Sequence, residues 1–310
     1  MATRPGSEWI AVDVGANKGY VIAGWLETLL GQDRTPFTPH NLGVSIYTHN
    51  TVKEGYLNLC GGCTECIDPP VHMPQTQRAS KVKVYAFEPS VANFKWLSFF
   101  YNDSSVVNVT NAAVSHTPSM AYFPDGVLGK ETGKVSSVPL EGYVPVKIVS
   151  LDAFLASANI AYVDILSTDA EGFDQEVAKG ARKLLEEGRV GVYQFEMYRA
   201  EDYKSIFERL YRWGYVCYYF TEVRKGYSAP WLIRISGCWQ DYFQNLIGWV
   251  NGLCYNRRVP ELAPIFDRLS MKMHRNGGPS RARARRGVLA FVDRYVPKRE
   301  STIEENREEK

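Results

Sequence analysis

The sequence predicts an α/β protein built on a doubly wound, mostly parallel β-sheet. Short apolar segments of strand type alternate along the chain with segments whose apolar residues recur at helical spacing. A glycine-containing turn joins the first such strand to the first helix, as at the start of a βαβ unit. The chain has 310 residues, 45% of them hydrophobic and 23% charged, which is typical of globular proteins and long enough for a full core.

The first strand and the first helix are the clearest elements. Residues 8–14 form a short apolar run, and the turn from Gly15 to Gly19 follows directly. Apolar side chains then recur at helical spacing from Val21 to Leu30, and Gly31 is placed to end the helix. We therefore expect the folded part to begin with a strand, a glycine turn and a helix.

An insertion is expected after the first helix, at residues 31–80. Proline, glycine, asparagine and threonine dominate there, and three closely spaced cysteines lie within it. A structureless loop of this length is uncommon in a compact domain, so we expect the insertion to have some structure of its own.

The alternation of strands and helices resumes after residue 80. Strands are expected at 81–88, 106–114, 146–149, 161–167, 190–195 and 215–220, and helices at 91–101, 151–156, 173–187 and 200–213. Residues 115–145 are rich in turns and compatible with a hairpin, and 231–235 and 249–255 are expected to be late antiparallel strands. The domain thus covers residues 8–260, and 261–310 is expected to be a flexible basic and polar tail.

The charge and hydropathy patterns disfavour a membrane protein or a nucleic-acid-binding protein. The net charge is +2, and no apolar run approaches the roughly 20 residues of a membrane-spanning helix. The first residues lack an apolar signal-peptide core, so a cytoplasmic protein is expected. The basic stretch from Arg281 to Arg286 is short and has no base-stacking motif beside it, so we expect a solvated tail. The sequence does not define the oligomeric state.

Acidic residues at two strand ends, together with the glycine turn, indicate a ligand site. Asp13 lies at the end of the first strand, and Glu88 ends the second. The helix after the turn directs its positive end at a ligand there, and a strand-end carboxylate can accept hydrogen bonds from ribose hydroxyls. The dinucleotide pattern G-x-G-x-x-G is absent, so an adenosyl amino acid fits better, with a purely structural turn as the alternative.

The expected cofactor-binding residues come from the turn and from the strand ends beside it. They are Asp13, Gly15, Ala16, Asn17, Gly19, Glu88 and Asn111. Asn111 either bonds the edge of an adenine or closes a turn. The glycines are expected to let the backbone bend sharply and approach the ligand closely.

Five short segments occur in an order typical of one enzyme family. They are VDVGANKGY at 12–20, VYAFEP at 84–89, NAAV at 111–114, VSLD at 149–152 and DILSTDAEG at 164–172. Together they resemble the FkbM family of S-adenosylmethionine-dependent methyltransferases. The resemblance implies a Rossmann-like sheet of the seven-stranded methyltransferase type, with S-adenosyl-L-methionine as cofactor. It also implies O-methylation of a sugar, glycan or small natural product, so the expected partner is a small-molecule or glycan acceptor.

Two carboxylates are candidates for the chemistry of such a methyl transfer. The acceptor hydroxyl needs a base or a hydrogen-bond acceptor as it attacks. Asp169 follows the fourth core strand and Glu196 the fifth, where ligands bind in open α/β sheets. Asp169 is the first candidate for orienting the acceptor or acting as base, with capping of the next helix as its alternative. Glu196 either supports that residue or lines the acceptor site, and His116 either reaches the site or lies on the surface.

Two other classes of function remain open. An NAD(P)-binding oxidoreductase would use a similar fold, although its glycine fingerprint is absent. A non-catalytic Rossmann-like interaction protein would keep the fold without turnover. Ser167 leaves that alternative open, because the resemblance implies a lysine at this position in many members of the family.

The cysteines of the insertion are candidate metal ligands. Cys60, Cys63 and Cys66 form two overlapping C-x-x-C spacings, each of which can bring two thiolates to one tetrahedral ion. With His72 they would make a structural zinc site. The alternatives are one disulfide with a free thiol, or three plain cysteines. The chain has six cysteines, which is no dense disulfide framework, so we expect reduced cysteines.

Overall fold

The structure is a computed structural model that describes residues 8–49, 78–130, 133–198, 203–221, 231–236 and 249–270. The strands of the main sheet are β1 (Glu8–Val14), β2 (Lys81–Phe87), β3 (Val107–Thr110), β7 (Val163–Thr168), β8 (Val190–Tyr198), β9 (Tyr215–Thr221), β10 (Trp231–Arg234) and β11 (Trp249–Asn256). A small sheet contains β4 (Ala113–Val114), β5 (Ser119–Pro124) and β6 (Tyr143–Val149). The helices are α1 (Tyr20–Leu30), α2 (Pro39–His49), α3 (Val91–Phe100), α4 (Leu151–Ser157), α5 (Asp174–Gly180), α6 (Arg182–Glu186), α7 (Tyr203–Arg212) and α9 (Ala263–Leu269).

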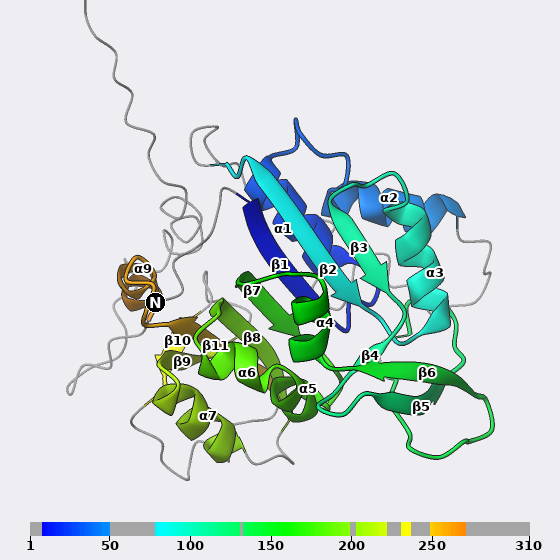
Figure 1. Ribbon diagram of the computed structural model, residues 1–310. Coiled ribbons are helices and arrows are strands. Elements are labelled where there is room, and N and C mark those ends of the chain that lie inside the picture. Colours follow the sequence, from blue (N-terminus) through cyan, green and yellow to red (C-terminus); the bar gives the residue numbers. More distant parts are fainter. Residues whose placement is uncertain are drawn as a thin grey trace, which may run out of the picture.

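The main sheet is mostly parallel, as predicted. Its eight described strands follow the order β10-β9-β11-β8-β7-β1-β2-β3 (Figure 1). Neighbouring strands pair in parallel from β3 through β2, β1 and β7 to β8. Strand β9 runs in the same direction, because β11 is antiparallel to both β8 and β9. At the edge, β10 pairs antiparallel with β9. The predicted late antiparallel strands are therefore confirmed, and the described sheet has one strand more than the seven-stranded type.

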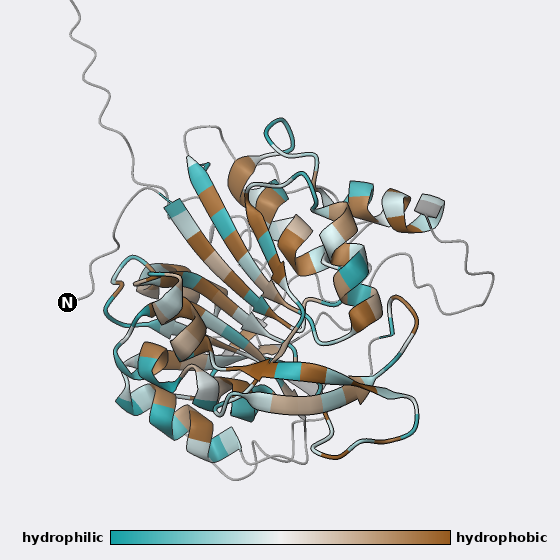
Figure 2. Ribbon diagram, turned by 45° about the vertical axis from the view of Figure 1, so that its right-hand side comes forward, coloured by the Kyte–Doolittle hydropathy of each residue, from teal (hydrophilic) through white to brown (hydrophobic). Residues whose placement is uncertain are grey.

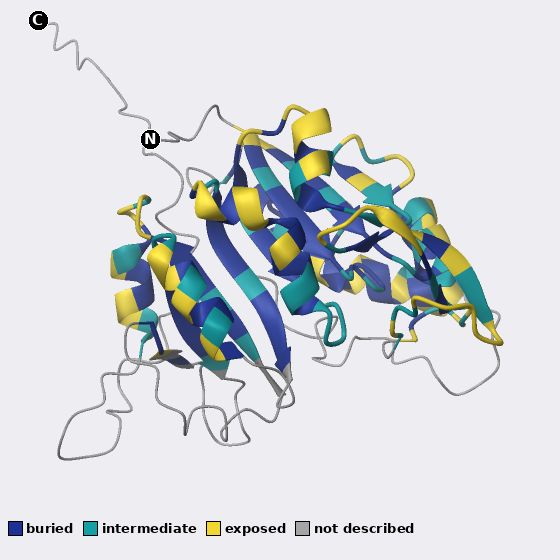
Figure 3. Cartoon of the chain, turned by 60° about the horizontal axis from the view of Figure 1, so that its bottom comes forward, coloured by how far each residue is buried: buried dark blue, intermediate teal, exposed yellow. Residues whose placement is uncertain are grey.

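Helices cover both faces of this sheet. On one face Val12 and Val14 belong to a core cluster with buried residues of α4, α5, α6 and α7. On the other face Trp9 and Ala11 pack with buried residues of α1, α2 and α3. Side chains that alternate along β1 thus contribute to two cores. Figure 3 shows the strands dark blue between helices with yellow outer surfaces, and Figure 2 shows helices striped brown and teal, the pattern of helices with one apolar face.

The predicted strand 106–114 divides into β3 and β4, which belong to different sheets. The cause is a turn at Asn111. The Ala112 N–H donates to the Thr110 carbonyl at 3.0 Å, and the Asn111 amide donates to the carbonyls of Glu88 (2.8 Å) and Pro89 (3.2 Å). After this turn the chain passes from β3, which pairs with β2, to β4 in the small sheet. The turn-rich segment after β4 contains the predicted hairpin, in which β5 pairs antiparallel with β6.

The predicted helix 173–187 divides into α5 and α6. A side chain at Gly180 would clash with the Ser115 carbonyl, so the end of α5 is packed tightly against the backbone at Ser115. In a continuous helix the Leu184 N–H would donate to the Gly180 carbonyl. It donates instead to Asp152 Oδ1 at 2.9 Å, and the Gly180 carbonyl accepts a bond from the Ser150 hydroxyl at 3.0 Å. These long-range partners interrupt the helical ladder.

The insertion contributes at least one packed helix. In α2, Leu42 and Ile46 are fully buried and join the core cluster around α1. The predicted zinc ligands Cys60, Cys63, Cys66 and His72 lie outside the described residues, so the zinc site stays a prediction. Within the described ranges, no three His, Cys, Asp or Glu side chains are grouped as metal ligands.

The predicted tail boundary at residue 260 is wrong. Leu262 and Phe266 are fully buried, and they pack with Tyr218 and Tyr255 at the β9–β11 end of the sheet. Because α9 supplies these side chains, the folded part continues to Ser270. Residues 271–310 lie outside the described residues. No helix within the described ranges is long and apolar enough to cross a bilayer.

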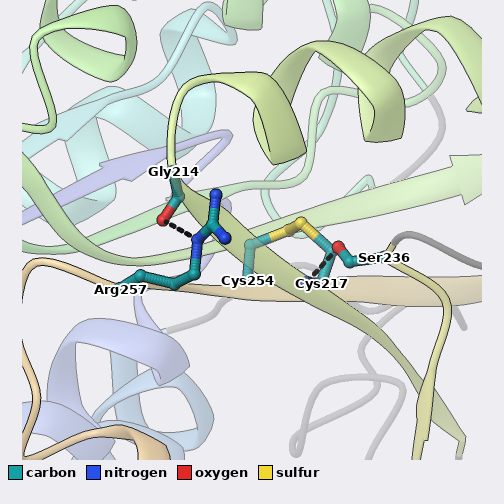
Figure 4. The surroundings of a disulfide bond; sticks show 5 residues. All are labelled: Gly214, Cys217, Ser236, Cys254 and Arg257. Carbon is teal, nitrogen blue, oxygen red and sulfur yellow. Dashed lines mark hydrogen bonds between the residues drawn. A yellow bond between two sulfur atoms is a disulfide. The ribbon is translucent and has the colours of Figure 1, made fainter.

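A disulfide joins β9 and β11 (Figure 4). Cys217 and Cys254 are directly opposite in the antiparallel register, with Cα atoms 4.0 Å apart, and both side chains are fully buried. The Cys217 N–H also donates to the Ser236 hydroxyl at 2.7 Å. The expectation of reduced cysteines is therefore wrong for this pair. Their separation of 37 residues gave no local signal, because the pairing depends on β11 lying next to β9.

Replacing both Cys217 and Cys254 with alanine is expected to lower the free energy of unfolding by about 2–4 kcal/mol, because the unfolded chain gains freedom. Urea denaturation of the variant and the wild type measures the difference. A reductant should lower the stability of the wild type toward that of the variant and leave the variant unchanged. If reductant does not change the free energy of unfolding of the wild type, the disulfide does not contribute to the stability of the protein.

Candidate active site

A cavity of about 500 Å³ lies at the carboxyl ends of β1, β2, β7 and β8. Its wall includes the turn after β1 and, from the small-sheet region, Phe123, Val135 and Ile148. The small sheet lies across the ends of β1, β2 and β3 (Figure 1). The chain continues from β1 to β2 on one side, whereas β7 pairs with β1 on the other side. This is the topological switch point at which open α/β sheets bind ligands.

The turn after β1 is held against the end of β2. The N–H groups of Gly15 and Ala16 both donate to the Phe87 carbonyl, at 2.9 and 3.2 Å. Gly15, Asn17 and Gly19 have positive φ angles of 82°, 48° and 96°, so three of five residues adopt left-handed backbone. Glycine adopts that conformation at little cost, and asparagine tolerates it better than most residues.

The two glycines serve close packing of the protein itself. A Cβ atom at Gly15 would collide with the Asp169 carbonyl oxygen, and one at Gly19 would lie 2.7 Å from Leu97 Cδ2. The sharp bend expected at these glycines is confirmed by their positive φ angles, and the close approach to a ligand stays a prediction. Both glycines still line the cavity with their backbone atoms, together with Ala16 and Asn17.

Glu88 connects the ends of two structural elements. Its Oε2 accepts the Asn17 N–H at 2.7 Å, and its Oε1 accepts the Ser90 N–H at 2.8 Å. Burial raises the pKa of Glu88 to about 7, although both N–H groups favour its ionised form. A carboxylate oxygen can accept a second hydrogen bond, so Glu88 lines the cavity with acceptor capacity to spare.

Asp13 contributes a buried carboxylate oxygen to the same cavity. The residue is 2% exposed, and Oδ2 has no hydrogen-bond partner among the described residues. Burial, and then the charge of Glu88, raises the pKa of Asp13 to about 7, while a hydrogen bond with the Ser167 side chain lowers it. A buried polar atom without a partner is costly. A ligand that donates a hydrogen bond to Asp13 fits this arrangement.

The structure brings Asp169 and Glu196 together, as the sequence predicts. Both line the cavity, Asp169 just after β7 and Glu196 on the neighbouring β8. The Asp169 side chain opens to the cavity although protein surrounds it on most sides, whereas Glu196 is 3% exposed. Burial raises the pKa of Asp169, and the charge of Glu196 and a hydrogen bond with it raise the pKa further. The two carboxyl groups are therefore hydrogen-bonded, and Asp169 holds its proton more tightly than an ordinary aspartate does.

Asp174, rather than Asp169, organises the start of α5. The Thr168 hydroxyl donates to its Oδ1 at 2.7 Å, and the Ala170 N–H donates to its Oδ2 at 3.2 Å. Asp174 is fully buried, and burial raises its pKa to about 7. The helix-capping alternative for Asp169 therefore does not hold, and Asp169 is available to the cavity.

Comparison with known proteins identifies the family. The family model described as the methyltransferase FkbM domain matches residues 13–217, which is more than half of the chain. The chain belongs to the FkbM methyltransferase family. This FkbM chain is also similar to the hexuronic acid methyltransferase AglP of Haloferax volcanii, with 26% identity over 110 residues. That match covers 35% of the chain and 45% of AglP, so it spans less than half of the relative.

Solved methyltransferase structures show a distant likeness to this FkbM chain. The FkbM methyltransferase of Methylobacillus flagellatus KT has 15% identity and a TM-score of 0.33, and the match covers 63% of this chain and 34% of that one. An rRNA methylase of Streptococcus thermophilus has 9% identity and a TM-score of 0.36, with coverage of 83% and 98%.

Two predicted residues of the FkbM chain do not reach the cavity. The side-chain amide of Asn111 donates to the carbonyls of Glu88 and Pro89, so Asn111 closes a turn. It is not among the residues that line the cavity. His116 is exposed and lies 2.8 Å from Glu176 Oε2 on the surface.

Sequence reasoning also missed polar residues of the cavity wall. They include Lys18, Asn93, Lys130, Gln194 and Asn251. The signal for the last two was a side-chain amide inside a mostly apolar strand.

The free energy of unfolding of the ligand-free protein is expected to fall as the pH rises from about 5 to about 7.5. The pKa values of Asp13, Glu88 and Asp174 are about 7 in the folded protein, above the ordinary values of 3.8 to 4.5. In this window the unfolded chain has released these protons and the folded chain still holds them. Each group therefore lowers the free energy of unfolding by about 1.4 kcal/mol per pH unit.

Urea denaturation across this pH range measures the slope. Asp13→Asn removes one of the groups and should make the slope smaller, whatever it does to the absolute stability. Stability that rises with pH across the window would contradict the buried, partly protonated carboxyl groups.

Proposed function

We propose that this protein transfers a methyl group from S-adenosyl-L-methionine to a hydroxyl group of a sugar, glycan or other small molecule. One observation carries the proposal. A single cavity is lined both by the turn with Asp13 and Glu88 and by the Asp169–Glu196 pair. Membership of the FkbM methyltransferase family supports the reaction class.

The donor end of the cavity suits an adenosyl amino acid. Oδ2 of Asp13 would accept a hydrogen bond from the ligand, and Glu88 would accept ribose hydroxyls beside the two N–H groups it already binds. The first residues of α1 line the cavity as well, and the N-terminus of a helix carries a partial positive charge. The donor supplies an electrophilic methyl group when it is bound.

The Asp169–Glu196 pair would accept the proton of the acceptor hydroxyl. An acceptor hydroxyl that gains a methyl group must lose its proton. Two hydrogen-bonded carboxyl groups can pass a proton between them, so the Asp169–Glu196 pair would take up that proton. The pair also orients the hydroxyl by accepting its hydrogen bond before the transfer.

Thermal unfolding with added ligands tests the donor. S-Adenosylmethionine and S-adenosylhomocysteine are expected to raise the melting temperature, and NAD is expected to leave it unchanged. A ligand present at about 100 times its dissociation constant adds about 2.7 kcal/mol to the stability. Stabilisation by NAD alone would favour the oxidoreductase. Donor binding without transfer of labelled methyl to any of a panel of glycosides would favour the non-catalytic protein.

A further inference from the structure

Polar side chains occupy one face of the main sheet where four neighbouring strands meet the cavity. Asp13, Ser167 and Gln194 are aligned across β1, β7 and β8 in the parallel register. Asn251 of β11 is directly opposite Glu196 of β8. Residues in register on paired strands project from the same face of a sheet, and so do residues two apart on one strand. All five line the cavity.

The rest of the sheet around these residues is apolar. On the opposite face Leu166, Tyr193 and Phe195 belong to the main core. On the same face, the earlier positions Ala11 and Val192 belong to apolar clusters. Strands buried on both faces are usually apolar throughout. The polar residues are confined to the strand ends that line the cavity, where a bound molecule can reach them, so they indicate a surface built for a ligand.

Two of the five residues, Gln194 and Asn251, belong to neither the donor end nor the carboxyl pair. Asn251 is positioned by its neighbour Gly252, where a Cβ atom would lie 2.6 Å from the Phe195 ring, so β11 packs tightly on β8. The disulfide at Cys254 fixes the same strand to β9 (Figure 4). A side-chain amide both donates and accepts hydrogen bonds, as a hydroxyl group does.

Negative charge gathers beside the two amides. Asp169, Glu171 and Glu196 line the cavity and Asp174 is buried nearby, so that with Asp13 and Glu88 the carboxyl groups outnumber the two lining lysines, Lys18 and Lys130. A carboxylate on the acceptor would add a like charge next to this group, which costs free energy where water is partly excluded. An uncharged molecule with several hydroxyl groups avoids that cost and can bond to both amides.

We propose that Gln194 and Asn251 form an acceptor subsite for an uncharged, polyhydroxylated molecule and present one of its hydroxyls to the Asp169–Glu196 pair. The subsite rests on the methyl-transfer function proposed above and adds to it a class of acceptor. Gln194 and Asn251 are positioning residues that select the acceptor, while Asp169 and Glu196 handle the proton.

A matched pair of sugars tests the class of acceptor. Methyl glucopyranoside and methyl glucuronopyranoside differ at one carbon, where the first has a hydroxymethyl group and the second a carboxylate. Binding to protein saturated with S-adenosylhomocysteine is measured by saturation-transfer NMR. The neutral glycoside is expected to bind, and the uronide to bind at least about tenfold more weakly. Equal binding, including none by either, or preference for the uronide overturns the proposal.

Single variants test the two residues. Gln194→Met and Asn251→Leu keep similar volumes and remove the amides, so the neutral glycoside is expected to bind about five- to tenfold more weakly. The dissociation constant of S-adenosylhomocysteine should change less than about twofold, because the donor end is intact. Asn102→Leu replaces an exposed asparagine after α3 and should change neither constant.

The outcomes separate this proposal from the proposed function. If wild-type protein takes up no S-adenosylhomocysteine, the methyl-transfer function fails and the subsite fails with it. If the donor product binds and both variants bind the glycoside as the wild type does, only the subsite is overturned. Retained donor binding also shows that each variant is folded, and Asn251→Asp, which adds a negative charge, should weaken binding of the uronide further.

Discussion

Gly15→Ala is expected to lower the free energy of unfolding by about 2–6 kcal/mol, which is enough to unfold many domains. Two costs add. The backbone at Gly15 has φ 82°, where an alanine is strained. The new Cβ would also collide with the Asp169 carbonyl oxygen, and a backbone atom cannot move aside as the tip of a side chain can. The turn and the end of β7 would have to separate, which would also open the cavity.

A second glycine separates the two costs. Gly142 has φ 73°, and no atom would lie within 4 Å of a Cβ there, so Gly142→Ala introduces backbone strain without a steric clash. It is expected to cost about 1 kcal/mol. Chemical denaturation of both variants gives the comparison. Equal effects of the two substitutions would show that Asp169 does not pack against the turn as the structure has it.

Asp169→Asn is expected to lower kcat by about 10²- to 10⁴-fold, with an acceptor that the wild type methylates. The asparagine keeps the shape of the side chain and removes the carboxyl group that pairs with Glu196. Affinity for S-adenosylhomocysteine should change little, because Asp13 and Glu88 are untouched. The variant should also be more stable than the wild type near pH 8, because the folded wild type must keep a proton on Asp169 beside Glu196 that the unfolded chain has released.

Glu171→Gln is the matched control for this effect. Glu171 lines the same cavity but lies in the turn before α5, with a positive φ of 52°. Its loss should lower kcat less than about tenfold, since it is not part of the Asp169–Glu196 pair. If Asp169→Asn retains more than a tenth of wild-type kcat, or if both variants fall equally, Asp169 does not take the proton.

Local patterns predicted the parallel frame of the fold and the donor end of the site. The first strand was expected at 8–14, and β1 is Glu8–Val14; the sixth was expected at 215–220, and β9 is Tyr215–Thr221. Asp13, Glu88 and the turn lie within a few residues of strand ends, so position along the chain was enough to place them together. These features depend on short-range spacing and on the rule that parallel strands end at one edge.

Features that depend on contacts between distant segments were not predictable in this way. The bonds of Asn111 to Glu88 and Pro89 end β3 early, and the bond of Leu184 to Asp152 divides a helix. Asn251 reaches the cavity only because β11 inserts between β8 and β9, and the disulfide forms for the same reason. No local pattern encodes which strand a late antiparallel segment will join.

Titration calorimetry of S-adenosylhomocysteine against wild type and Asp13→Asn tests most directly whether the turn after β1 and its two carboxylates hold an adenosyl donor. We predict one binding event in the wild type and an affinity about 10- to 100-fold lower in the variant, since a hydrogen bond to a buried carboxylate is lost. Folded wild-type protein that releases no heat, or a variant that binds as the wild type does, would contradict the assignment.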